Sequence, residues 1–285
     1  MKLSIVTNEL EEKSTNWELQ QIIKEVSARK IPYELINITN HFEYKNEDAQ
    51  LGSHIFWWKS DLIRPVQLGT FLELMENKTI INGLKPGKIL SRYKSYQQTM
   101  VNRLSDVRAV PTFLIRNVDE ADDLIAEGLL SYPFIQKPNF GFQGRGVRLI
   151  KSKEDLLASD SALYKTVLQP YIENTGDYRI LIVGGEVLGV MRRTAAEGQI
   201  VNNFSQGGEV EHITDTELVD RLGVKSLKIA KVFQSNFCGI DLIYDEKVNQ
   251  YRFLEINFSP GWKGFGKATG INVAKKIVDE YLTNA

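Results

Sequence analysis

Cysteine and histidine are scarce in this sequence. Its 285 residues include one cysteine and three histidines, so an internal disulfide is excluded. The cysteine, Cys238, stands in an apolar run, which favours a buried structural thiol over a reactive one. Sparse cysteine is typical of a reducing compartment, and we therefore expect a cytoplasmic protein.

Long apolar runs and a strong net charge are missing as well. The sequence has no run of about 18 apolar residues, so we expect no membrane span, and its first residues turn polar too early for a signal peptide. The net charge of −1 provides no overall field that would attract nucleic acid. A hydrophobic share of 42% with 25% charged residues is ordinary for a globular protein and excludes general disorder.

Two common phosphate-binding signatures are also absent. No G-x-G-x-x-G follows the first predicted strand, so the sequence does not support a Rossmann dinucleotide site. The glycine-rich run NFGFQGRG at 139–146 lies between two predicted strands, 134–137 and 147–150, and no helix carrying Lys-Ser/Thr follows it, as a P-loop would require. Its glycines allow close backbone approach, so the loop can offer N–H groups to phosphate oxygens. A plain flexible hairpin explains the same pattern.

Hydrophobic periodicity predicts alternating strands and helices in the first 90 residues and hairpins with helices after them, so we expect an α/β protein with a parallel N-terminal sheet. A capping box at Thr15 and Glu18 opens the first helix, and Gly223 permits a break in a later one. The predicted helices span 15–29, 66–76, 93–104, 118–126, 216–233 and 272–282. The main predicted strands span 3–6, 33–38, 54–58, 79–81, 110–115, 134–137, 147–150, 167–172, 178–183, 186–191, 239–244 and 251–257.

The last two strands carry the most informative polar residues. Side chains two apart share a face of a strand, so Glu255 and Asn257 point together, and a turn at 245–250 can bring Asp241 beside them. These are hard oxygen ligands without histidine or cysteine, which suits Mg²⁺ and a phosphate-bearing substrate. For Asp241 alone, a solvated strand edge is the competing interpretation.

Several separated motifs together resemble the ATP-grasp superfamily, in particular its RimK-like carboxylate–amine ligases. In chain order they are Lys137, GFQGRG at 141–146, LQPYI at 168–172, DYR at 177–179, RRTAAEG at 192–198, Asp241, the run EINFSPG at 255–261 and TGINVA at 269–274. The resemblance runs from about residue 91 to the end. It implies an α/β N-terminal domain (1–90), an α+β central lid subdomain with the glycine-rich loop (91–168) and an α+β C-terminal subdomain with the metal and substrate site (169–285), the last two clamping ATP.

The resemblance assigns an ATP site. Lys94 and Lys137 would contact the ATP phosphates, and the glycine-rich loop at 141–146 would cover them. The hinge at 169–172 would bind the adenine edge. In the hinge Pro170 replaces the usual Glu and lacks an N–H, so adenine recognition would rely on the Pro170 carbonyl and the Ile172 N–H. The expected ATP-binding residues are Lys94, Lys137, Gly141, Phe142, Gln143, Gly144, Gly146, Gln169, Pro170, Tyr171, Ile172, Asp177 and Leu254.

The resemblance also implies the reaction. A substrate carboxylate would attack ATP to give an acyl phosphate, and an amine would displace phosphate to form an amide. Asp241, Glu255 and Asn257 would bind Mg²⁺ or Mn²⁺, and Arg179 and Arg193 would be catalytic. The expected substrate-binding residues are Arg192, Arg193, Asn203, Ser259 and Gly261.

The substrates are less closely specified. The expected carboxylate belongs to a small molecule, a peptide or a protein tail, and the amine to an amino acid such as L-glutamate, although Trp262-Lys263-Gly264 departs from the usual Leu-Glu-Gly. Trp262 can stack on a substrate or pack beneath the loop. We expect no nucleic-acid or membrane partner, and a homo-oligomer, dimer or tetramer, as in relatives. A nucleotide-binding regulator without turnover and a small-molecule kinase on the same fold are the alternatives.

Overall fold

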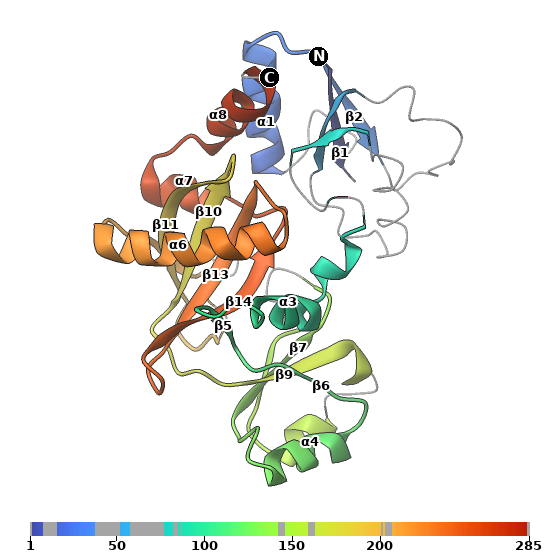
Figure 1. Ribbon diagram of the computed structural model, residues 1–285, viewed down its shortest axis with the longest axis vertical. Helices are drawn as coiled ribbons and strands as arrows, with labels where there is room; N and C mark the ends of the chain where they lie inside the picture. Colours follow the sequence, from blue (N-terminus) through green and yellow to red (C-terminus); the bar gives the residue numbers. More distant parts are fainter. Residues whose placement is uncertain are drawn as a thin grey trace.

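The computed structural model describes residues 2–7, 16–37, 52–57, 77–81, 85, 87–141, 146–158, 163–200, 202 and 207–283. Thr15, the predicted helix at 66–76, Phe142, Gln143, Gly144 and Asn203 lie outside these residues. The described chain forms three sheets, which Figure 1 shows one above another along the long axis. This architecture confirms the predicted fold class.

The N-terminal sheet has four strands in the order β2-β1-β3-β4, and all its pairings are parallel, as predicted. Helix α1 begins after Asn16, whose side chain accepts a hydrogen bond from the Leu19 N–H at 3.1 Å. The predicted start at Thr15 was therefore wrong by one residue, because Asn16 provides the N-cap oxygen. The elements are β1 (Leu3–Thr7), α1 (Trp17–Ala28), β2 (Tyr33–Asn37), β3 (His54–Trp57) and β4 (Thr79–Ile80).

The largest sheet has six strands in the order β12-β11-β10-β13-β14-β5. Both predicted hairpins are present, and Gly184 and Gly185 turn the first with φ of 65° and 79°, a region that favours glycine. The two outermost strands were not predicted. The elements are β5 (Arg108–Ala109), β10 (Asp177–Val183), β11 (Glu186–Thr194), β12 (Glu209–His212), β13 (Cys238–Asp245) and β14 (Gln250–Asn257).

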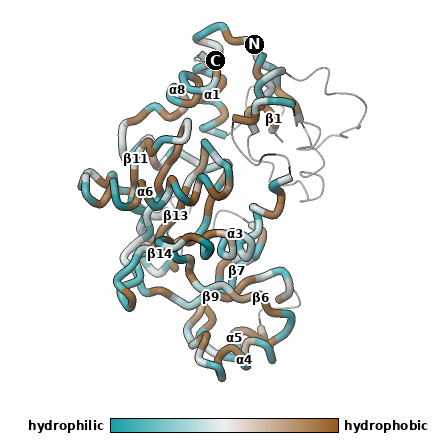
Figure 2. The backbone as a smooth tube through the Cα atoms, viewed as in Figure 1, coloured by the Kyte–Doolittle hydropathy of each residue, from teal (hydrophilic) through white to brown (hydrophobic). Residues whose placement is uncertain are grey.

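Helix α6 (Thr216–Val232) covers one face of this sheet and runs through Gly223 without a break. A Cβ at Gly223 would lie 3.3 Å from a methyl of Val187, so the glycine allows close packing rather than a bend. The colours along α6 alternate between hydrophilic and hydrophobic in Figure 2, as expected for a helix with one buried face.

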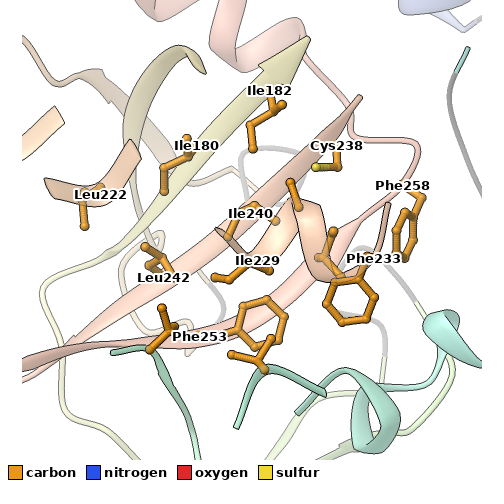
Figure 3. Close-up of a cluster of buried hydrophobic side chains, with 14 of the residues drawn as sticks. Ile180, Ile182, Leu222, Ile229, Phe233, Cys238, Ile240, Leu242, Phe253 and Phe258 are labelled. Carbon is orange, nitrogen blue, oxygen red and sulfur yellow. The ribbon is translucent and has the colours of Figure 1, made fainter. Parts of the chain in front are cut away.

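Two cores fill the faces of the six-stranded sheet. Beneath α6, Ile180, Ile240 and Phe253 pack against Leu222 and Ile229 (Figure 3). Cys238 belongs to this core and is fully buried, as predicted, and burial raises the pKa of its thiol to about 12.

The second core lies on the opposite face of this sheet and joins it to the N-terminal part. Leu181, Val183 and Met191 of the sheet pack there with Trp262 and with residues of α1. Trp262 is 1% exposed, with its ring 5.9 Å from that of Phe237, so it packs beneath the loop. The C-terminal elements of this region are α7 (Lys263–Thr269), α8 (Val273–Val278) and a π-helical turn, η5 (Asp279–Thr283).

The third sheet has the order β6-β9-β7-β8 and its own small core, which includes Ile115, Phe134 and Leu168. Of the strand predicted at 110–115, only Phe113–Leu114 forms a strand, β6, in this sheet, and β5 of the large sheet ends just before the predicted range. Pro111 lies between them and has no N–H for a ladder. The elements are the 3-10 helix η2 (Ile89–Arg92), α3 (Lys94–Val101), β6 (Phe113–Leu114), α4 (Val118–Ala126), β7 (Phe134–Pro138), β8 (Arg148–Ile150), α5 (Lys153–Leu157), the 3-10 helix η3 (Leu163–Lys165) and β9 (Thr166–Pro170). Among the described residues, no helix has the length and apolarity to span a membrane.

Candidate active site

Charged side chains gather on the face of the six-stranded sheet that points away from α6. The strand register places Asp177 opposite Arg193, and Asp241 between Arg179 and Glu255. Because side chains alternate along a strand, these residues face away from Ile180, Ile240 and the other residues beneath α6. A bulge between Asp241 and Leu242 shifts the register so that Glu255 and Asn257 lie on the charged face.

Two arginines bind the carboxylates at the centre of this face. Arg179 donates from Nε and Nη2 to the two oxygens of Asp241, at 2.7 and 2.6 Å. Arg193 donates from Nε to Asp177 at 2.6 Å, and its Nη2 lies 2.9 Å from Asp241 Oδ2. Asp177, Arg193 and Asp241 are all buried. Buried charges persist only when they are paired, so these four residues form one network.

Burial and pairing oppose each other in this network. Burial acts to raise the pKa of Asp241, but Arg179 and Arg193 hold it below its ordinary value. For Asp177 burial dominates and raises the pKa, although Arg193 counteracts it. Burial acts against the charge of Arg193, yet Asp177 and Asp241 raise its pKa. Arg193 therefore remains cationic in the sheet.

The three predicted metal ligands are adjacent. Asn257 Nδ2 lies 3.1 Å from Glu255 Oε1 and 3.3 Å from Asp241 Oδ2. In the part of the chain that the structure describes, no three His, Cys, Asp or Glu side chains form a metal-binding group. A three-ligand site therefore needs the Asn257 amide oxygen as well as both carboxylates. Such an all-oxygen set fits Mg²⁺ or Mn²⁺.

Two lysines approach this group from the central part of the chain. Lys94, the first residue of α3, donates to the Gly141 carbonyl at 3.0 Å, and its Nζ lies 3.8 Å from Glu255. Lys137 on β7 is 8% exposed. Burial and the neighbouring charge of Lys94 lower the pKa of Lys137 to about 8, although Glu255 and Asp241 oppose this shift. Two amino groups thus converge near the carboxylates, as a site for phosphates requires.

Both ends of the glycine-rich loop lie close to the end of β7, and one of them contacts Lys94. Gly141 follows β7, and its carbonyl is the acceptor for Lys94. Gly146 has φ of 75°, and a Cβ there would lie 2.9 Å from Pro138 Cγ. This close approach explains why the loop closes on a glycine.

The predicted adenine hinge ends β9. Gln169 donates from Nε2 to Thr112 Oγ1 at 2.7 Å, and the Ile172 carbonyl accepts from Asn174 Nδ2 at 2.8 Å. Pro170 and Tyr171 lie between them. The carbonyl of Leu254, on the strand that carries Glu255, accepts from Gln98 Nε2 at 2.7 Å.

The other predicted substrate residues that the structure describes are Arg192, Ser259 and Gly261. Arg192 is opposite Tyr178, which packs on the core beneath α6, so its side chain leaves the strand on the other face. It donates to the Thr175 carbonyl at 2.7 Å. Ser259 and Gly261 follow β14, and a Cβ at Gly261 would lie 3.1 Å from Glu18 Oε1.

Sequence reasoning missed three buried polar residues next to the site. Glu18 of α1 accepts from the Lys263 N–H at 3.4 Å, and Gln97 and Gln98 of α3 bond to the backbone of β14. Their partners are distant in sequence. The sequence offered one signal for them: each is a polar residue at a helix position where the apolar periodicity of α1 or α3 predicts burial.

Comparison with known proteins agrees with this arrangement. The model of the RimK-like ATP-grasp domain matches residues 88–281. A "Probable alpha-L-glutamate ligase" of Thioalkalivibrio sulfidiphilus is 33% identical over 173 residues, which cover 59% of this chain and 56% of that protein. The chain thus spans little more than half the length of this curated relative.

Solved structures share the fold at low identity. D-alanine–D-alanine ligase of Bacillus anthracis, complexed with ATP, has a TM-score of 0.73 at 17% identity, covering 99% of this chain and 96% of that one. The ATP-grasp ligase PsnB with a precursor variant, Mg and ADP has a TM-score of 0.71 at 13% identity, covering 99% and 97%. Because the family model matches more than half of the sequence, the chain belongs to the RimK-like ATP-grasp family.

Proposed function

We propose that the protein is an ATP-dependent carboxylate–amine ligase that forms an amide bond through an acyl phosphate. The observation that carries this proposal is the buried Arg179–Asp241–Arg193–Asp177 network beside Glu255 and Asn257. It places fixed positive charge next to a group of hard oxygen ligands. That combination suits the binding of carboxylate, acyl phosphate and metal–nucleotide in one site.

ATP would bind between the central sheet and the large sheet. Lys94 and Lys137 would contact its phosphates, the loop from Gly141 to Gly146 would cover them, and the segment from Gln169 to Ile172 would bind adenine. The ATP and ADP complexes of the two structural neighbours support a nucleotide site in this fold. We place the lid boundaries at residues 91 and 168, with the N-terminal domain before it and the metal subdomain after it.

Asp241, Glu255 and Asn257 would hold Mg²⁺, or Mn²⁺, against the nucleotide phosphates. For this, the Asn257 amide oxygen would have to face the ion, and Asp241 would serve both the ion and the arginines. The ion supplies charge neutralisation at the phosphate oxygens. Mg in the PsnB structure supports a divalent ion in this fold.

Arg193 and Arg179 would hold the acyl phosphate while two displacements take place. In the first, an oxygen of the substrate carboxylate bonds to the γ-phosphorus, and the bond from that phosphorus to the bridging oxygen of ADP breaks. In the second, the amine nitrogen bonds to the acyl carbon, phosphate leaves with the former carboxylate oxygen, and the amine releases a proton. Positioning and fixed charge provide the acceleration, without a covalent protein nucleophile.

The amine substrate we propose is an amino acid such as L-glutamate. The relative named as an alpha-L-glutamate ligase supports this substrate. The carboxylate belongs to a small molecule, a peptide or a protein tail, and the PsnB complex with a precursor supports a peptide.

We also propose that the protein is cytoplasmic and forms a homo-oligomer.

The direct test is phosphate release from ATP in the presence of Mg²⁺ and paired panels of carboxylates and amino acids. We expect release that requires one carboxylate and one amine, together with a new amide in the mass spectrum. Stable phosphate on a hydroxyl would instead indicate a kinase. Tight nucleotide binding without turnover on any pair would indicate a regulator.

The variant Glu255→Gln tests the metal site. We expect turnover to fall by at least about 100-fold, because the loss of one charged ligand weakens stabilisation of the transferring phosphoryl group, while the fold is retained. The matched control is Glu246→Gln, since Glu246 is an exposed residue in the turn of the same hairpin. Steady-state rates at saturating Mg²⁺ compare the two. Normal turnover in Glu255→Gln would remove Glu255 from the site.

A further inference from the structure

Gln97 of α3 contacts β14 as a neighbouring strand would. Its Oε1 accepts from the Ile256 N–H at 3.1 Å, and its Nε2 lies 3.2 Å from the Ile256 carbonyl. The same Nε2 donates to the Ser91 carbonyl at 2.8 Å. Gln97 is 3% exposed, so water cannot readily replace these bonds. One amide thus satisfies both backbone groups of a single strand residue.

The contact of Gln97 with β14 lies beyond the point where β14 stops pairing with β5. On this side of β14, strand β5 pairs only with Arg252 and Phe253. Beyond Phe253, in the part of the chain that the structure describes, the backbone partners on this side are side chains of α3. Gln98 bonds to the Leu254 carbonyl, and Gln97 bonds to Ile256. Helix α3 therefore continues the edge of the sheet.

Ile256 lies between Glu255 and Asn257, two of the proposed metal ligands. Its N–H and carbonyl belong to the peptide groups that join it to these two residues. Fixing both peptide groups fixes the directions in which the Glu255 and Asn257 side chains leave the strand. Metal ligands need this support, because a site works only when its ligands are held within about 0.5 Å of the required geometry.

We propose that Gln97 is a positioning residue for the divalent metal site, acting through the backbone of Ile256. The proposal rests on the proposed function, since it requires Glu255 and Asn257 to be ligands. Gln97 itself touches neither the ion nor the substrates. Loss of such a supporting group typically weakens metal binding by about 10- to 100-fold.

The test measures Mn²⁺ affinity by electron paramagnetic resonance in the presence of ADP, on the full chain. Gln97→Met keeps the length of the side chain and removes both bonds to Ile256. Gln97→Asn keeps the amide but is one methylene shorter, and it serves if the methionine variant fails to fold. Val101→Ala is the matched comparison, because Val101 is buried on the same helix and packs in the apolar core beneath α6, where its side chain cannot bond to the backbone of β14. Hydrogen exchange of the segment around Ile256 reports whether its N–H has lost protection.

We expect Gln97→Met to weaken Mn²⁺ binding by about 10- to 100-fold, and Val101→Ala by less than about threefold. Faster exchange at Ile256 should accompany the first variant only. Equal weakening in both variants would assign the effect to general packing of α3 and overturn the proposal. Wild-type Mn²⁺ affinity in Gln97→Met, with binding lost in Glu255→Gln, would overturn the role of Gln97 and leave the metal site intact. Wild-type affinity in Glu255→Gln would instead refute the metal site.

Discussion

Replacing Lys137 by methionine is expected to stabilise the ligand-free protein and to weaken its binding of ATP. The pKa of Lys137 is lowered from 10.5 to about 8, chiefly by burial. At about 1.4 kcal/mol per pKa unit, keeping this lysine charged costs the folded state about 3 kcal/mol at neutral pH. Methionine fills a similar volume without a charge. The protein therefore retains an unfavourable charge where the proposed phosphates would bind.

The contribution of Lys137 to the free energy of unfolding should depend on pH. Between pH 8 and pH 10.5 the unfolded chain binds more protons at Lys137 than the folded chain, so this residue makes stability rise as the pH rises through that window. The Lys137→Met variant lacks this contribution. Denaturant unfolding at pH 7.5 and pH 9.5 should show a stability gain that is largest at pH 7.5. No gain over wild type at pH 7.5 would contradict the explanation.

The affinity for ATP should fall in Lys137→Met, although the stability of the ligand-free protein rises. Phosphates stabilise the charged lysine, so wild-type affinity should fall as the pH rises through about 8, and Lys137→Met should bind ATP about 10- to 100-fold more weakly at pH 7. Calorimetry in buffers of different ionisation enthalpy would detect the proton taken up on binding. Lys231→Met, at an exposed position of α6, is the control and should change neither quantity.

Local patterns predicted the strands that carry the site, whereas long-range partners had to be seen in the structure. Alternation along 251–257 was enough to place Glu255 and Asn257 on one face, and Asp241 is indeed their cross-strand neighbour. Nothing within that hairpin indicated that Arg179, 62 positions before Asp241, would bind both of its oxygens.

Contacts with distant parts of the chain also explain the smaller differences between the predicted and observed helices and strands. Whether Gly223 bends a helix or admits a close neighbour depends on Val187, from another strand. Only Phe113 and Leu114 of the strand predicted at 110–115 pair with β9, whereas the residues just before that range pair with β14 in another sheet. A sequence pattern shows which face a residue occupies, but not which distant element covers that face.

Replacing Arg193 by methionine should abolish turnover and strongly destabilise the protein. Arg193 bonds to Asp177 and Asp241. Asp241 would keep Arg179, but Asp177 would remain buried without this partner, and breaking a buried ion pair costs about 3–5 kcal/mol. We expect turnover to fall by at least about 1,000-fold if Arg193 holds the acyl phosphate. Denaturant unfolding and phosphate release measure the two effects separately.

A double variant separates the structural role of Arg193 from its catalytic role. Asp177→Asn removes the charge that Arg193→Met leaves unpaired, so the double variant should regain much of the lost stability but none of the turnover.

In the single variant the pKa of Asp177 should rise further above its ordinary value, because burial raises it and Arg193 no longer counteracts this effect. The folded state then binds this proton more tightly than the unfolded chain, so the destabilisation should shrink as the pH falls from 8 to 5. Lys275→Met, which breaks the exposed pair with Asp279, should leave stability nearly unchanged. Turnover restored in the double variant would show that Arg193 serves only to neutralise Asp177.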